Sequence, residues 1–258
     1  MKRQTIQLLL ALLAFHGNAL ASQTPTQGVF TLYSNQPSDS PSYIWLSKAY
    51  RELYRRLGID VTIVSVPEAR ASILAETGTI DGQFGRVWEY LYRHNSQIRI
   101  NEPLYQVTLV AYVHADSGIS LKQGWKSFHN TPLSVEYRRG VLVAQQNLER
   151  TVSADRLSTI TNIRNGLLKV KRKRVDVFVQ ADVGALPFIN SEEFANEVVS
   201  AGKMQTVAMY HYIHEQYAHL QPAMEIEILA MKEAGLIRRY CLEAFSASPS
   251  SCQDHLLP

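Results

Sequence analysis

Hydrophobic and polar positions follow two periods in the first third of the chain, and this predicts strands separated by helices. Residues 28–34 and 59–66 alternate with a period of two and are rich in β-branched side chains, so each predicts a strand. Between them, apolar side chains recur at helical spacing from residue 45 to residue 57, after the capping pair Ser40 and Pro41. We therefore expect the chain to begin with a strand, a helix and a second strand.

A second helix and a third strand follow in the same order. The helical pattern begins at Pro67 and stops at Gly78, and residues 80–84 predict a brief strand. These elements make a βαβαβ unit, which predicts a parallel sheet with right-handed crossovers. Arg86 comes just after this strand, at the sheet edge where open α/β sheets bind ligands, so it is a candidate binding residue.

A similar alternation recurs downstream and predicts a second α/β unit. Strands are expected over residues 133–137, 157–161 and 175–180, and helices over 141–150 and 163–173. The fold class is therefore α/β with two lobes.

Two apolar extended runs, residues 104–113 and 204–212, separate the second unit from the rest. If each run is a strand that crosses between lobes, the chain passes twice through a hinge and returns to the first lobe. Lobe 1 would then comprise residues 22–109 and 206–258, and lobe 2 residues 110–205. This arrangement predicts a clamshell that binds its ligand between the lobes.

The N-terminus has the pattern of a cleavable secretory signal over residues 1–21. Lys2 and Arg3 precede an apolar run over residues 6–15, and Ala19 and Ala21 supply the small side chains of a cleavage site after Ala21. We therefore expect a periplasmic protein. Cleavage lowers the formal net charge from +3 to +1, which predicts no nucleic-acid partner.

The chain has two cysteines, Cys241 and Cys252, and we expect them to form a disulfide in an oxidising compartment. Two free thiols are the alternative. The eight histidines are not paired with these cysteines, and among them His211, His214 and His219 are close in sequence without sharing one helix face, so no metal site is predicted.

Taken in order, several segments resemble the family 3 extracellular solute-binding proteins, the amino-acid-type periplasmic binding proteins. They are RASILAETGTIDGQFGRV, VEYRRG, RVDVFV and YHYIHEQYAHL. The resemblance covers nearly the whole chain after the signal. It implies a type II periplasmic binding fold with a two-strand hinge, a monomer without a cofactor, and a small-molecule ligand. It also implies a membrane partner, either an ABC permease or a sensor.

The chain departs from the family pattern in the segment that binds the ligand carboxylate. Members that bind α-amino acids carry a Thr-x-x-Arg segment after the third strand, whereas this chain has GRVWEY. Arg86 is a candidate for a substitute clamp, although it does not match the motif and a surface pair with Glu89 explains it equally well. The resemblance implies that Asp182 meets a ligand amine, and the predicted ligand-binding residues are Tyr33, Phe84, Arg86, Tyr105, Tyr137, Arg138, Gly140 and Asp182.

Several of these residues have a structural interpretation as well. Aromatic side chains at strand ends often only pack, and Gly140 starts a helix whose N-H groups face an anion. Arg70 and Asp81 are expected to form a structural pair that ties a helix to a strand end.

The function predicted from the sequence is capture of a small polar, carboxylate-bearing, amino-acid-like solute for ABC-type transport or sensing, without catalysis. A periplasmic enzyme on the same fold, similar to cyclohexadienyl dehydratase, is the alternative. The sequence offers no acid and base at a recognisable spacing, so no catalytic residue is predicted.

Overall fold

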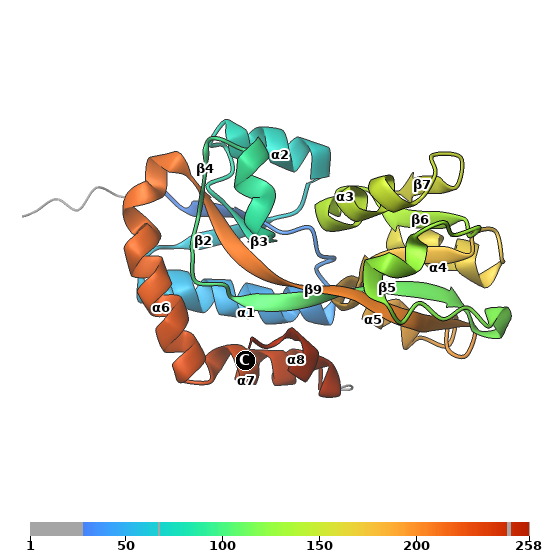
Figure 1. Cartoon of the computed structure of the whole chain (residues 1–258). Helices are drawn as coiled ribbons and strands as arrows, with labels where there is room; N and C mark the ends of the chain where they lie inside the picture. Colours follow the sequence, from blue (N-terminus) through green and yellow to red (C-terminus); the bar gives the residue numbers. More distant parts are fainter. Residues whose placement is uncertain (1–27, 67, 247–248, 258) are drawn as a thin grey trace, which may run out of the picture.

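Two groups of helices and strands, joined by two long strands, make up the described part of the chain (Figure 1). The computed structural model describes residues 28–66, 68–246 and 249–257. The predicted signal over residues 1–21 lies outside the described residues. The architecture is the mixed α/β arrangement that the hydrophobic pattern predicts.

The first group contains the predicted βαβαβ unit. Its elements are β1 (Phe30–Tyr33), α1 (Pro41–Arg56), β2 (Val61–Val64), α2 (Glu68–Glu76) and β3 (Gly82–Arg86). Strand β1 lies between β2 and β3 and is parallel to both, as predicted.

Helix α1 shows why the sequence forms this unit. The hydroxyl of Ser40 accepts a hydrogen bond from the backbone N-H of Tyr43 at 3.2 Å, and Pro41 occupies the first helical turn. One face of the helix, which includes Trp45 and Leu53, is fully buried. This face packs on the sheet and forms the main core of the first group.

Strand β3 begins two residues later than predicted. The backbone N-H of Ile80 donates to the carbonyl of Leu74, so residue 80 closes the turn after α2 instead of joining the sheet. Pairing begins at Gly82, which lies opposite Leu32, and Arg86 is the last residue of the strand.

The second group repeats the first. It contains β6 (Val135–Arg138), α3 (Leu142–Thr151), β7 (Leu157–Ile160), α4 (Ile163–Lys171) and β8 (Val177–Ala181). Strand β6 is parallel to both β7 and β8, which confirms the predicted order. Helix α5 (Asp182–Ile189) follows β8 directly.

Two antiparallel strands, β5 (Tyr105–His114) and β9 (Val198–His214), connect the groups. The strand order β2-β1-β3-β9-β5-β8-β6-β7 puts both between the parallel halves, and the two-strand crossing predicted from the apolar runs is confirmed. The predicted lobe boundaries come after Leu109 on β5 and after Gln205 on β9. These two residues lie opposite each other in the strand pairing. The division at this point stays a prediction.

The remaining elements extend the two groups. They are η1 (Trp88–Arg93), β4 (Gln97–Arg99), η2 (Ala115–Ser117), η3 (Gly124–Phe128), η4 (Glu215–Leu220), α6 (Gln221–Glu233), α7 (Leu236–Ala244) and α8 (Ser250–His255). Met224 and Ile228 of α6 and Ile237 of α7 are buried in the same core as α1, so the chain returns to the first group as predicted. Within the described ranges, no helix has both the length and the apolar character needed to cross a membrane.

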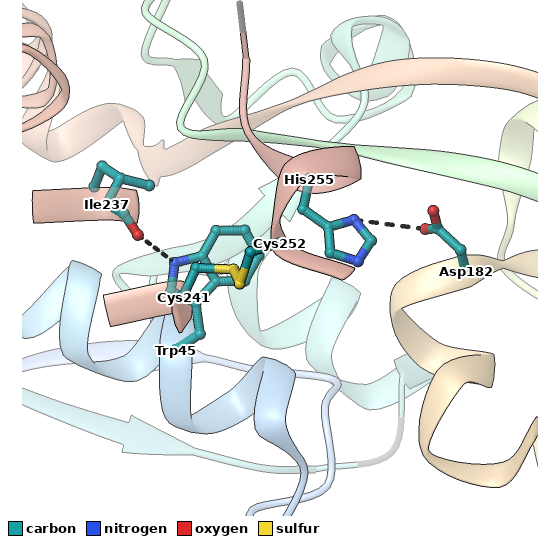
Figure 2. Close-up of a disulfide and its surroundings, with 6 residues drawn as sticks. All are labelled: Trp45, Asp182, Ile237, Cys241, Cys252 and His255. Carbon is teal, nitrogen blue, oxygen red and sulfur yellow. Dashed lines mark hydrogen bonds and ion pairs between the residues drawn. A yellow bond between two sulfur atoms is a disulfide. The ribbon is translucent and has the colours of Figure 1, made fainter. Parts of the chain in front are cut away.

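The C-terminal segment is held by the predicted disulfide, which the structure confirms between Cys241 of α7 and Cys252 of α8 (Figure 2). Nearby, the indole N-H of Trp45 donates to the carbonyl of Ile237 at 3.0 Å. Helix α8 carries His255 into a fully buried position, with Nδ1 3.8 Å from Oδ1 of Asp182 on α5. The tail therefore connects the core of the first group to the start of α5.

We expect the double variant Cys241→Ala, Cys252→Ala to lose about 2 to 3 kcal/mol of unfolding free energy, since the disulfide restricts the unfolded tail. Urea unfolding of the variant and of the unreduced wild type measures the difference. Reduced wild type is the matched control and should move toward the variant. Equal midpoints for all three samples would show that the disulfide contributes no stability.

Candidate functional site

A cavity of about 300 Å³ lies between the two groups. Its walls come from the carboxyl ends of parallel strands in both halves: Asn35 follows β1, Arg86 ends β3, Arg138 ends β6 and Ala181 ends β8. This is the edge at which open α/β sheets bind ligands. Its position between the halves makes the cavity the candidate binding site.

The two connecting strands form the apolar part of the cavity. Val107 and Leu109 of β5 and Val207 and Met209 of β9 line it. Tyr105 lines it too and packs closely on β3, because a Cβ at Gly85 would lie 2.4 Å from the Tyr105 hydroxyl. Glycine at position 85 therefore lets the hinge strand approach the end of β3.

Arg86 is oriented by its own strand. The pairing of β3 with β9 shifts register between Gln83 and Arg86. Such an irregularity changes the direction of the side chains that follow it. The Arg86 guanidinium donates from Nε and Nη2 to Oε1 of Gln83, at 3.1 and 2.9 Å. Its Cζ also lies 5.0 Å from the ring centroid of Tyr90, another cavity residue.

Gln83 is itself fixed by buried partners. Its Nε2 donates to Oε1 of Gln97 at 2.9 Å, and Nε2 of Gln97 donates to the carbonyl of Ala75 at 2.8 Å. Both amides are buried. Arg86 is thus held on the cavity wall by a hydrogen-bonded chain that reaches back to α2.

His211 of β9 completes the support of Gln83. Its Nδ1 donates to the Gln83 carbonyl at 2.8 Å, and its Nε2 accepts a hydrogen bond from the Tyr54 hydroxyl at 2.7 Å. Burial lowers the pKa of His211 to about 4, so the ring is neutral at neutral pH. This neutral form has the one donor and the one acceptor that its surroundings require.

The opposite wall is formed by the turn from β6 into α3. Arg138, Arg139 and Gly140 line the cavity, and Gly140 has a φ of +88°, a conformation that favours glycine. No side chain caps the start of α3, whose first residues Leu142 and Val143 also line the cavity. Uncapped N-H groups at a helix N-terminus favour an anion.

Gln180 of β8 contributes a buried polar group to the same wall. It is 2% exposed, and its Oε1 has no hydrogen-bond partner among the described residues. Its amide packs against α5, since a Cβ at Gly184 would lie 2.8 Å from Nε2 of Gln180.

Four of the predicted ligand-binding residues line the cavity: Arg86, Tyr105, Arg138 and Gly140. Tyr33, Phe84 and Tyr137 are buried and are not among its lining residues. The ring of Tyr33 lies 5.6 Å from Cζ of Arg86, the ring of Phe84 stacks on Tyr50 at 4.4 Å, and the hydroxyl of Tyr137 donates to Glu149. These three aromatic side chains take the packing roles that strand-end aromatics often have.

Asp182 is also placed outside the cavity lining. Its Oδ1 accepts hydrogen bonds from the backbone N-H groups of Thr108 on β5 and Val183 on α5, at 3.1 and 2.7 Å. Figure 2 shows its carboxylate directed toward His255. Burial raises the pKa of Asp182 and lowers that of His255. The residue expected to meet a ligand amine instead joins the hinge to the C-terminal tail.

Asp81, which was expected to pair with Arg70, bonds to other residues in the structure. Its carboxylate accepts from the backbone N-H of Thr31 at 2.7 Å and from the Tyr217 hydroxyl at 2.8 Å. Arg70 is exposed on α2 and is not among these partners. Glu89, the other partner considered for Arg86, is exposed on η1.

The sequence reasoning missed several cavity residues. They include Gln36, Ser72, Tyr90, Arg93, His94, Arg139 and Gln180. Tyr90, Arg93 and His94 belong to or directly follow η1, in the segment GRVWEYLYRH, where polar and aromatic residues alternate without a clear period. Among the described residues, no group of His, Cys, Asp or Glu has the arrangement of a metal site.

Comparison with known proteins identifies the fold. No family model matches the chain. An uncharacterized protein of Shewanella oneidensis is 26% identical over 262 residues, which cover 97% of each chain. A histidine kinase sensor domain with similarity to periplasmic binding proteins has a TM-score of 0.72 at 14% identity, covering 90% of this chain and 98% of that chain. An ancestral arginine-binding protein bound to arginine has a TM-score of 0.69 at 14% identity, covering 85% and 99%.

These similarities confirm the fold that the sequence resemblance implied. The chain has the two-lobed fold of the family 3 solute-binding proteins. At this level of identity, the similarity concerns the fold alone.

The buried His211 predicts a pH dependence of stability. Its folded pKa of about 4 lies below the ordinary value of 6.5, so between these pH values the unfolded chain binds the proton and the folded chain does not. The free energy of unfolding should therefore fall as the pH falls through this window, by up to about 1.4 kcal/mol per unit. Urea unfolding at pH 7, 6 and 5 tests this, and the slope should be shallower in His211→Gln.

His129→Gln is the control, because His129 is exposed. The quantity compared is the slope with pH, so a loss of absolute stability in His211→Gln does not obscure the result. Equal slopes in His211→Gln and the wild type would contradict the assignment of a neutral His211.

Proposed function

We propose that this chain is a periplasmic solute-binding protein that captures a small polar, carboxylate-bearing solute between its lobes, for ABC-type transport or sensing. The observation that carries the proposal is Arg86, held by Gln83 on the wall of a cavity whose other wall is the Arg138 to Gly140 turn. The proposed ligand-binding residues are Arg86, Tyr105, Arg138 and Gly140.

The chemistry of the walls suits a carboxylate. A guanidinium presents planar, paired donors that match two carboxylate oxygens, and orientation by Gln83 reduces the entropy lost on binding. Closure of the lobes would exclude water and strengthen these charge-assisted hydrogen bonds.

The connecting strands support a closing motion. Since β5 and β9 are the strands that join the parallel halves, bending of this pair would change the distance between the cavity walls. The closed surface would then be the form recognised by a membrane permease or a sensor.

Other features support the proposed periplasmic location and the proposed membrane partner. The predicted signal and the Cys241 to Cys252 disulfide both support an oxidising, extracytoplasmic location. The similar structures include both a histidine kinase sensor domain and an arginine-binding protein, so the proposal includes sensing and transport. These similar structures, a sensor domain and a binding protein, give no support to the dehydratase alternative.

A thermal-shift screen of amino acids, organic acids, polyamines and small aromatic compounds tests the proposal. A ligand at about 100 times its dissociation constant should stabilise the fold by roughly 2.7 kcal/mol. Solution scattering with the best ligand should show a more compact particle. A screen with no carboxylate among its hits would contradict the proposal.

Substitution of Arg86 separates binding from folding. Arg86→Ala should weaken binding of a carboxylate hit by about 2 to 5 kcal/mol, because it removes a charge-assisted pair from a closed site. Calorimetric titration measures the loss. Arg70→Ala, which changes an exposed arginine of α2, is the matched control and should bind normally. Normal binding by Arg86→Ala would show that Arg86 does not bind the ligand carboxylate.

A further inference from the structure

The cavity wall of the first group contains a histidine that a carboxylate holds in place. His94, the residue after η1, lines the cavity, and its Nδ1 lies 2.7 Å from Oε1 of Glu76 on α2. The second carboxylate oxygen of Glu76 accepts a hydrogen bond from the Ser96 hydroxyl at 2.6 Å. Each oxygen of Glu76 thus has a donor, and the carboxylate fixes the position of the imidazole.

Packing also holds the His94 ring. It stacks on the ring of Tyr90, with the centroids 3.9 Å apart and an angle of 19° between the planes. Tyr90 is buried, and its hydroxyl accepts a hydrogen bond from Nε2 of Gln83 at 3.2 Å. Cζ of Arg86, the proposed partner of the solute carboxylate, lies 5.0 Å from the centroid of the same Tyr90 ring. His94 and Arg86 therefore lie against one aromatic side chain.

The bond to Glu76 determines which ring nitrogen is available to a solute. Burial opposes ionisation of Glu76, but hydrogen bonds from Ser96 and His94 lower its pKa below the ordinary value of 4.5, so at neutral pH the carboxylate is ionised and only accepts. Nδ1 of His94 therefore carries the hydrogen of this bond. Nε2 then has a lone pair in the neutral ring, and it carries a hydrogen only in the protonated ring.

A neutral acceptor on this wall selects a different group from the acid that the family resemblance implied. Asp182 was expected to meet a ligand amine, but its carboxylate bonds to the backbone N-H groups of Thr108 and Val183. An ionised carboxylate bonds most strongly to a charged donor such as an ammonium. A neutral imidazole accepts from any N-H or O-H group, so a hydroxyl is sufficient for a hydrogen bond to His94.

From these contacts we infer that the solute carries an N-H or O-H donor near its carboxylate, and that Nε2 of neutral His94 accepts a hydrogen bond from this donor. Hydroxy acids are then ligands of the cavity as well as amino acids. Glu76 is a positioning residue, because it acts on the solute through His94. This inference rests on the proposed function, since it adds a contact in the same cavity.

Protonation of His94 removes this acceptor. An imidazole changes its charge between about pH 5 and 8, whereas tyrosine and arginine side chains ordinarily do not titrate in that range. The titratable side chains nearest the ring are Glu76 of α2 and Tyr90 and Arg93 of η1. The others in the described lining are Arg86, Tyr105, Arg138 and Arg139. The preference for a donor-bearing solute should therefore decrease as the pH falls through this range.

Pairs of acids that differ only by a hydroxyl test the inference directly. The probes are lactate and propionate, malate and succinate, and 3-phenyllactate and 3-phenylpropionate, each titrated calorimetrically into the wild-type protein. At about pH 8, the hydroxy acid of at least one pair should bind about tenfold more tightly than its deoxy partner, since the partner leaves the acceptor unpaired in a closed site. This ratio should decrease toward one at about pH 5.5, where an imidazole is mostly protonated.

Variants locate the acceptor. His94→Asn keeps an N-H group for Glu76 but has no atom at the position of Nε2, so the ratio within the best pair should be close to one and should not change with pH. Glu76→Gln should also lower the ratio, because an amide N-H can donate to Nδ1 and so favour the tautomer with a hydrogen on Nε2. His129→Asn makes the same substitution at an exposed histidine outside the cavity lining and should keep the wild-type ratio.

The outcomes separate this inference from the proposed function. If carboxylates bind but no hydroxy acid binds more tightly than its deoxy partner, the inference is wrong and the proposed function stands. If His94→Asn keeps the wild-type ratio, or if the wild-type ratio is the same at both pH values, the assignment of the acceptor to His94 is wrong. If no carboxylate in the panel binds, both the proposed function and the inference are wrong.

Discussion

The antiparallel pairing of β5 and β9 is the interaction on which the rest of the structure depends. It runs from the Tyr105 and Met209 pair to the His114 and Val198 pair, and it joins two parallel half-sheets into one strand order. The same two strands supply the apolar residues of the cavity. Backbone hydrogen bonds therefore determine both how the two lobes are connected and what lies between them. The core of the first group includes Tyr105 and Val107 of β5 and Val183 of α5, so the packing of this group extends along the connecting strands.

Gln83 links this hinge to the candidate clamp. Its backbone carbonyl accepts from His211 on β9, and its side chain accepts from the Arg86 guanidinium. One buried residue thus connects a hinge strand to an arginine side chain that lines the cavity. Because buried polar groups without partners are costly, every member of this network is restricted to a narrow set of positions. The bonds to Gln83 therefore give Arg86 a defined orientation on the cavity wall.

The C-terminal tail packs beside the carboxylate of Asp182 at the start of α5. The disulfide between Cys241 and Cys252 holds α8 on the core of the first lobe, and His255 lies beside Asp182 at the start of α5. Asp182 also binds the hinge backbone at Thr108, so its carboxylate is turned from the cavity. The Asp182 carboxylate thus bonds within the protein, whereas the arginines of the β6 to α3 turn line the cavity.

The sequence by itself determined the order of strands and helices within the two α/β units, the two-strand crossing, the disulfide and the position of Arg86 at the edge of a sheet. These features follow from local periodicity, from capping residues such as Ser40, and from the fact that parallel strands end at one edge. The sequence did not determine which side chains meet across the cavity. The register shift after Gln83, the burial of Tyr33 and Phe84, and the turning of Asp182 toward His255 depend on partners far away in the chain. Only the tertiary structure decided them, because hydrogen bonds and packing between distant segments leave no period in the sequence.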